Sequence, residues 1–127
     1  MVSAVLDSSA ILAILHDEPG ARAAEAMLDD ALISTVNYAE VVAKLVERGS
    51  TSAQVQSALR SIALTTVDFD ITLAQRTGTL RAETIRRGLS LGDRACLALA
   101  EREGVPAITG DRSWVGAVSG VEVRLIR

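Results

Sequence analysis

Short apolar runs alternate with longer amphipathic stretches along this chain. The runs are rich in Val, Ile, Leu and Thr and are bounded by Gly, Pro, Asp or Ser, which is typical of buried strands. Between them, apolar residues recur with the 3.6-residue period of helices. Strands that alternate with helices predict a mainly parallel sheet in a three-layer α/β/α sandwich. The expected strands are 2–6, 31–35, 64–67, 105–109 and 121–126.

Polar residues at the ends of the helical stretches predict where helices begin and end. Ser8 or Ser9 can cap the first helix, and Asp70 is suited to be the N-cap of a long helix over 71–88. Gly78, in the middle of that helix, is interpreted as a close helix crossing, because an interior glycine costs stability without such a use.

The composition is that of one globular domain, expected to span residues 1–127. Hydrophobic residues make up 49% of the chain and charged residues 23%. Aromatic residues make up only 2%, so the core must consist of smaller aliphatic side chains. The chain therefore lacks the stacking platforms on which many single-strand binders rely. Trp114, the one Trp, is expected to lie over the edge of the core.

Charge and cysteine content narrow the class of protein further. A net charge of −3 argues against a general basic surface for nucleic acid, although it leaves room for a local basic rim. The single cysteine, Cys96, lies on an apolar helix face and is expected to be a small buried hydrophobe. No signal peptide or membrane span is recognisable, so we expect a cytoplasmic protein.

Four acids occupy corresponding places along the pattern. Asp7 directly follows the first strand, and Asp111 follows the fourth strand after a glycine. Open α/β folds bind ligands at the carboxyl ends of their strands, which is where both acids are expected. Asp93, in the first turn of the helix over 90–103, and Glu40, one turn into an earlier helix, could meet them there. We expect the four carboxylates to converge in one anionic pocket.

Each acid also has a purely structural interpretation. Asp7 could be a turn or capping acid, and Asp93 could simply favour the positive end of its helix dipole. Glu40 falls beside Asn37 on the polar side of its helix and could pair with Lys44 at i,i+4. For Asp7 and Glu40 taken singly, the structural interpretation is the stronger one.

A divalent metal ion is the simplest way to hold four carboxylates together. Without one they would repel each other, and at least one pKa would rise. Oxygen ligands without a Cys or His cluster suit Mg²⁺ or Mn²⁺ rather than zinc. His16 has no second histidine to complete a nitrogen site and is interpreted as part of a solvated helix end. Two such ions can activate water and stabilise the leaving oxygen of a phosphodiester, which is nuclease chemistry.

The order of these motifs resembles the PIN-domain ribonucleases, and among them the VapC toxins of bacterial VapBC toxin–antitoxin pairs. Four segments carry the resemblance, which covers nearly the whole chain. They are VLDSSAILAIL near the start, NYAEVVAKL around Glu40, LSLGDRACLALAE around Asp93, and ITGDRSW around Asp111. Each segment is weakly specific alone, and their order in a chain of this length is fairly specific.

The resemblance implies roles for the four acids. Asp7, Glu40 and Asp93 correspond to the three acids of the family and Asp111 to its more variable fourth. These residues would bind Mg²⁺ or Mn²⁺ and position the water that attacks an RNA phosphate, acting as an endoribonuclease on tRNA, rRNA or mRNA. Ser8 and Thr109 are expected to hold carboxylates by hydroxyl hydrogen bonds.

The resemblance also implies partners. The resemblance implies a homodimer. It also implies inhibition by a VapB-like antitoxin, whose C-terminal segment would cross the groove and often brings an Arg into the acidic pocket. The apolar face of the Glu40 helix could then pack on the core, a second subunit or the antitoxin. For the RNA phosphates we expect contacts from a basic rim at Arg86, Arg87 and Arg112.

Two other functions stay open at this point. A PIN-like module could bind RNA without cutting it. A receiver-like phosphoacceptor could use Asp7 or Asp111 with Mg²⁺, although such a domain needs a lysine late in the chain and the only one is Lys44.

Overall fold

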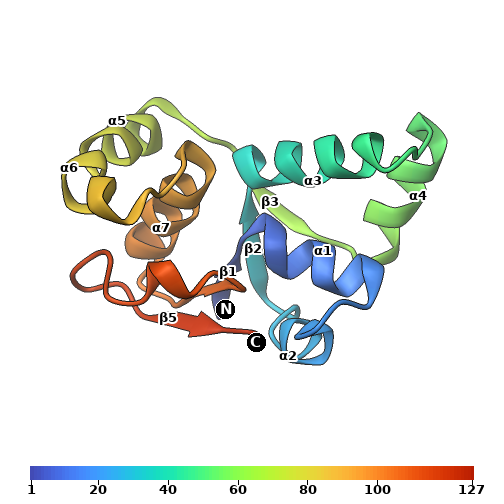
Figure 1. The fold of residues 1–127 in the computed structure, drawn as a ribbon, viewed down its shortest axis with the longest axis horizontal. Helices are drawn as coiled ribbons and strands as arrows, with labels where there is room; N and C mark the ends of the chain where they lie inside the picture. The colour runs from blue at the N-terminus through green and yellow to red at the C-terminus, as the bar shows by residue number, and fades with distance from the viewer.

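A computed structural model describes residues 1–127 and contains one five-stranded parallel sheet (Figure 1). The strand order is β3-β2-β1-β4-β5, and every neighbouring pair runs parallel. The prediction of a parallel three-layer fold is therefore confirmed. The strands are β1 (Ala4–Leu6), β2 (Ala31–Ser34), β3 (Thr65–Val67), β4 (Ala107–Thr109) and β5 (Val123–Leu125).

Helices cover both faces of this sheet. On one side lie α1 (Ser8–His16), α2 (Ala21–Ala26), α3 (Thr35–Glu47) and α4 (Ser52–Ser61). On the other side lie α5 (Ile71–Thr79), α6 (Arg81–Thr84) and α7 (Leu91–Glu103), with the short 3-10 turns η1 (Ile85–Arg87) and η2 (Arg112–Trp114). None of these helices is long and apolar enough to cross a membrane.

Alternation along the strands divides the buried residues into two cores. In β1, Ala4 and Leu6 face the core beneath α1 to α4, whereas Val5 faces the core beneath α5 and α7. The same division holds in β2 and β4, where Ile33 and Ile108 lie on the first side. A parallel sheet buried on both faces reads in the sequence as a short continuous apolar run, which is the pattern that predicted it.

The prediction of one long helix over 71–88 is wrong. The chain instead forms α5, α6 and η1 and ends at Gly88 in the left-handed conformation. Buried Arg94 of α7 donates from Nη1 to the Thr77 carbonyl at 2.9 Å, which satisfies a carbonyl in the last turn of α5 from outside the helix. Gly78 has no atom within 4 Å of where a side chain would begin, so it is not a close crossing.

Trp114 also differs from its prediction. Its side chain is fully buried in the core beneath α5 and α7, and it does not lie over the edge of that core. Asp70 caps α5 by accepting from the Leu73 backbone N–H, as predicted.

Candidate active site at the carboxyl ends of β1 and β4

Asp7 lies at the end of β1 and is almost fully buried, with 4% of its surface exposed. It is the N-cap of α1, a place that the sequence had assigned to Ser8 or Ser9. Its Oδ1 accepts from the Ala10 backbone N–H at 2.9 Å and from the Ser9 hydroxyl at 2.7 Å. Its Oδ2 accepts from the Thr109 hydroxyl at 2.6 Å. Two donors from the first turn of α1 and one from the end of β4 therefore fix this carboxylate.

The environment of Asp7 disfavours its charged form. The pKa of this carboxyl is raised from 3.8 to about 6, chiefly by burial and also by the nearby charge of Asp93. The hydrogen bonds from Thr109, Ser9 and Ala10 act in the opposite direction and lower the pKa, without cancelling the effect of burial. A buried carboxylate with this pKa is the kind of group that a cation would stabilise.

Asp93 lies in the first turn of α7 and is half-buried. It forms a capping box with Ser90, because its Oδ2 accepts from the Ser90 backbone N–H at 2.9 Å while the Ser90 hydroxyl accepts from the Asp93 N–H. Burial raises the pKa of Asp93, and the charge of Asp111 contributes in the same direction. Asp93 thus helps to cap α7, in keeping with the structural interpretation, and the cap leaves its Oδ1 without a hydrogen-bond donor.

Glu40 is held between α3 and α7. Buried Asn37 donates from Nδ2 to Glu40 Oε1 at 2.7 Å and to the Gly92 carbonyl at 3.0 Å. An ideal Cβ at Gly92 would lie 2.3 Å from Glu40 Oε2, so the carboxylate occupies space that only a glycine leaves open. The alternative in which Glu40 pairs with Lys44 is wrong: Lys44 pairs with Glu47 on the exposed side of α3.

Asp111 follows β4 and is joined to Asp7 through one side chain. The Thr109 hydroxyl that donates to Asp7 also accepts from the Asp111 backbone N–H at 3.0 Å. Asp111 Oδ1 accepts from both the N–H and the hydroxyl of Ser113, at 2.9 and 2.7 Å, and so caps η2. The Asp111 side chain is exposed, unlike that of Asp7.

These contacts bring all four acids to one end of the sheet. The acids of β1 and β4 lie where the chain connectivity reverses direction in the sheet, which is the usual ligand site of such folds. Buried Cys96, one turn after Asp93, has a pKa well above its ordinary value through burial and through the charges of Asp7, Asp93 and Glu40. As the side chains stand, however, no three acidic, histidine or cysteine residues are gathered closely enough to share a metal ion.

The donor set nevertheless suits a hard cation. Each acid is held by the protein through at least one oxygen and keeps acceptor capacity on another. Glu40 Oε2, Asp93 Oδ1 and Asp111 Oδ2 accept no hydrogen bond, and Asp7 Oδ2 accepts one. Asn37 Oδ1 is a further buried oxygen without a partner. Oxygen donors of this kind fit Mg²⁺ or Mn²⁺, after side-chain rotations that bring them together.

Comparison with known proteins identifies the family. A model of the PIN domain matches residues 4–117, a span that contains all four acids. The chain belongs to the PIN domain family. A protein named Ribonuclease VapC from Mycolicibacterium smegmatis is 35% identical over 113 residues, covering 82% of this PIN domain chain and 88% of that protein.

Solved structures share the fold of this PIN domain. VapBC2 from Rickettsia felis, bound to a DNA fragment from its promoter, matches with a TM-score of 0.76 and 19% identity over 98% of both chains. A toxin–antitoxin complex from Klebsiella pneumoniae matches with a TM-score of 0.71 and 24% identity over 98% of both chains. DNA-bound VapBC from Salmonella typhimurium gives a TM-score of 0.71 at 20% identity, with full coverage of both chains. At these identities the likeness concerns the fold.

Several expectations about supporting residues need correction. The hydroxyl that binds Asp7 is that of Ser9 and not that of Ser8, whereas the expected contact from Thr109 is present. Asn37 and Gly92, which hold Glu40, were missed. The sequence pattern placed Asn37 on the polar side of its helix. The one sequence signal for Gly92 was its position directly before an acid in the first turn of a helix.

The expected basic rim has three different outcomes. Arg87 donates from Nη1 to the carbonyls of Ser113 and Val115, at 3.2 and 2.8 Å, and therefore ties η1 to the loop after β4. Arg86 is exposed and makes no hydrogen bond or ion pair. Arg112 is exposed and lines a hollow together with Asp111. Contact with RNA stays a prediction for all three residues.

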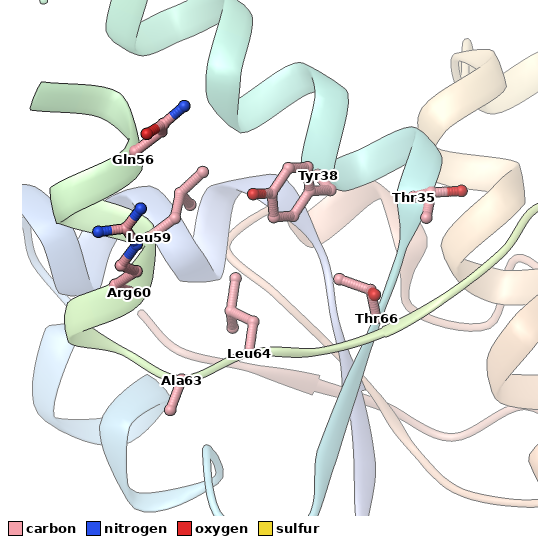
Figure 2. A pocket seen from close by; sticks show the side chains of 8 residues that line it. All are labelled: Thr35, Tyr38, Gln56, Leu59, Arg60, Ala63, Leu64 and Thr66. Carbon is pink, nitrogen blue, oxygen red and sulfur yellow. The ribbon is translucent and has the colours of Figure 1, made fainter. Parts of the chain in front are cut away.

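An apolar groove lies between α3 and α4, away from the acids. Figure 2 shows Tyr38 of α3 projecting between α4 and the segment that leads into β3, toward Leu64. Hollows of about 520 and 430 Å³ adjoin Tyr38, and the second is lined by Val42 and Val46. On the same helix, Val41 and Leu45 are buried in the core. The apolar face of α3 thus serves the core and also leaves a groove uncovered.

Proposed function

We propose that this PIN domain is a metal-dependent endoribonuclease and the toxin of a toxin–antitoxin pair. Two findings support this: the 35% identity to a protein named Ribonuclease VapC, and the four carboxylates gathered at the ligand-binding end of the sheet. The observation that carries the proposal is Asp7, an almost fully buried acid with a raised pKa and one oxygen still able to accept.

The proposed roles follow from how each acid is held. Mg²⁺ or Mn²⁺ would be bound by Asp7, Glu40, Asp93 and Asp111. The ion would lower the pKa of bound water and stabilise negative charge at the phosphate. Asp7 gives the most rigid position, because three donors fix it. Asn37 orients Glu40, and Thr109 links the positions of Asp7 and Asp111. These neighbours are positioning residues.

Charge supports a cation at this site. Burial raises the pKa of both Asp7 and Asp93; the charge of Asp93 adds to this for Asp7, and the charge of Asp111 adds to it for Asp93. Neither residue takes part in a salt bridge. A protein that needed these acids only as helix caps would gain more from exposed ones. A positive ligand would therefore stabilise both carboxylates.

For the protein partner we propose a VapB-like antitoxin with an amphipathic segment in the groove between α3 and α4. Val46 is 56% exposed there, beside the half-buried Tyr38 and Val42. An uncovered apolar groove of this kind suits the apolar side chains of a partner helix or extended segment. The solved structures that share the fold are described as VapBC or toxin–antitoxin complexes, in keeping with such a partner.

We also propose a homodimer. Exposed apolar side chains at Ile85 and Val115, 56% and 50% exposed, lie on two segments that Arg87 joins. Such residues favour burial against a second copy of the chain. Sedimentation of the free protein tests this, and a monomer at all accessible concentrations would contradict it.

The cleavage proposal is tested with the purified chain and single-stranded RNA. We expect cleavage in Mg²⁺ or Mn²⁺, none in EDTA, and none by Asp93→Asn, which keeps the helix-capping oxygen. The matched control is Asp68→Asn, because Asp68 is exposed and its side chain makes no hydrogen bond. Cleavage in EDTA, or full activity in both Asp7→Asn and Asp93→Asn, would overturn the proposal.

A second candidate is a PIN-domain module that binds RNA without cutting it. The observation that favours it is that no three acids are gathered closely enough for one ion. RNA binding without cleavage in any divalent metal would select it. A receiver-like phosphoacceptor has no such support, because Lys44 lies on the exposed side of α3 and pairs with Glu47.

A further inference from the structure

Arg127, at the far end of the sequence, lies directly against the candidate active site. Its guanidinium covers Gly110, the residue between Thr109 and Asp111. An ideal Cβ at Gly110 would lie 2.8 Å from Arg127 Cζ and Nη2 and 3.1 Å from Nε. Any side chain at this position would push the guanidinium away. Gly110 therefore permits an arginine to lie flat beside Asp111.

Only part of this guanidinium is used within the protein. Nη1 donates to the Pro19 carbonyl at 2.9 Å, which anchors Arg127 to the loop between α1 and α2. Nε and Nη2 have no acceptor in the protein, and Arg127 takes part in no ion pair. These two nitrogens form the edge with which an arginine binds two oxygens of one anion.

Arg127 lines a polar hollow. The hollow has a volume of about 670 Å³ and no apolar lining residue. Arg112 lies on it as a second cation without an ion pair, and Asp111 is its only acid. Ser9, whose hydroxyl binds Asp7, also lines it. The hollow therefore shares one wall with the acidic site and carries two cations against one carboxylate.

We propose that Arg127 and Arg112 form a subsite for an RNA phosphodiester next to the one that is cut. This inference rests on the proposed ribonuclease function and names the groups that hold the substrate. A phosphodiester has two free oxygens that match the Nε and Nη2 edge, and its charge opposes the two arginines. In an acidic chain, cations placed beside the acids can bind the RNA backbone without a general basic surface.

The test is RNA binding in EDTA, where metal-dependent cleavage is absent. Anisotropy of a short fluorescein-labelled single-stranded RNA is measured over a range of salt concentrations for wild type and Arg127→Gln. We expect Arg127→Gln to weaken binding about tenfold and to reduce the slope of log affinity against log salt by about 0.7, the value for one phosphate contact to a single strand. Arg127→Lys should keep the slope and lose part of the affinity, because it keeps the charge without the two-pronged edge.

Two further variants separate the subsite from general effects. Arg81→Gln removes one charge from α6, where Arg81 is exposed and makes no hydrogen bond. Helix α6 itself lies well away from the C-terminus in Figure 1. This variant should bind RNA like wild type. Gly110→Ala keeps every charge but displaces the Arg127 guanidinium, so it should weaken binding. Thermal melts establish that each variant is folded.

The outcomes are distinguishable from those of the function test. Wild-type affinity in Arg127→Gln, or an equal loss in Arg81→Gln, overturns the subsite while leaving metal-dependent cleavage to decide the function. Loss of antitoxin binding with unchanged RNA binding assigns Arg127 to the protein partner and also overturns it. Arg127-dependent RNA binding without cleavage in any metal upholds the subsite and removes the nuclease. No RNA binding by wild type removes the subsite.

Discussion

The carboxylate of Glu40 occupies the place that a side chain at residue 92 would fill. From an ideal Cβ at Gly92, Glu40 Oε2 lies 2.3 Å away and Oε1 lies 2.5 Å away. Asn37 bridges the two residues by donating to Glu40 and to the Gly92 carbonyl. Because Gly92 directly precedes Asp93, this contact brings the acid of α3 beside the acid of α7.

Gly92→Ala is therefore expected to displace Glu40 while leaving α7 helical. Loss of a residue that positions a metal ligand typically costs about 10- to 100-fold in affinity or activity, and we expect a fall of that size in metal-dependent RNA cleavage. The control is Gly78→Ala in α5, which meets no atom within 4 Å and should stabilise the fold by about 0.5–1 kcal/mol with unchanged activity. Full activity in Gly92→Ala would show that Glu40 needs no such placement.

Thr109→Val removes the hydroxyl shared by Asp7 and Asp111. Asp7 Oδ2 would lose its 2.6 Å donor and the Asp111 N–H its acceptor, with little change in volume. We expect a loss of about 1–3 kcal/mol in the free energy of unfolding at neutral pH, measured with urea, together with reduced cleavage. Thr109→Ser, which keeps the hydroxyl, should recover both. Equal behaviour of the Val and Ser variants would rule out a role for the hydroxyl.

The raised pKa of Asp7 predicts how stability depends on pH in the metal-free protein. The folded state holds the proton more tightly than the unfolded state, so this contribution is fully present below about pH 4 and is lost as pH rises through about 6. Asp7→Asn should remove this dependence. At pH 7 in EDTA it should be about 2–3 kcal/mol more stable than wild type by urea unfolding, with little difference below pH 4. A variant that is less stable than wild type at pH 7 would contradict the prediction.

Val46→Glu tests the groove between α3 and α4. A charge among Tyr38, Val42 and Val55 should prevent an apolar segment from packing there. We expect co-purification with the cognate antitoxin to be lost and RNA cleavage by the free protein to be kept. The control is Ile71→Glu, because Ile71 is 74% exposed on α5, on the other side of the sheet. Intact antitoxin binding in Val46→Glu would place the partner elsewhere.

Much of the fold could be predicted from local patterns. The strands are apolar runs that end at Asp, Ser or Gly, and capping residues such as Thr51 and Ser90 mark helix starts in the sequence. The break at Leu80 carries no local signal in the sequence. The contact found beside it joins distant segments, since Arg94 of α7 donates to the Thr77 carbonyl. Trp114 was misjudged for a similar reason: its burial depends on packing from distant segments.

The candidate site, too, could be predicted only in part. Its four acids could be located because each stands at a strand end or in an early helical turn, and strand ends meet in a parallel sheet. Asn37, Gly92 and Arg127 could not, because each depends on a contact with a distant part of the sequence. Asn37 bonds to Gly92, 55 residues away, and Arg127 lies against Gly110, the residue after β4. The sequence also could not show whether Ser8 or Ser9 binds Asp7. Both are near it, and only the geometry of the first turn decides which hydroxyl reaches it.

The central claim is that Asp7, Glu40, Asp93 and Asp111 together hold a divalent cation. Calorimetric titration of the metal-free protein with Mn²⁺ tests it most directly, at about pH 6 and in buffers of different ionisation enthalpy. We predict binding with proton release, since the cation must displace the proton that Asp7 partly holds at this pH, and loss of that binding in Asp7→Asn and Asp93→Asn. No Mn²⁺ binding by wild type, or equal binding in both variants, would contradict the account.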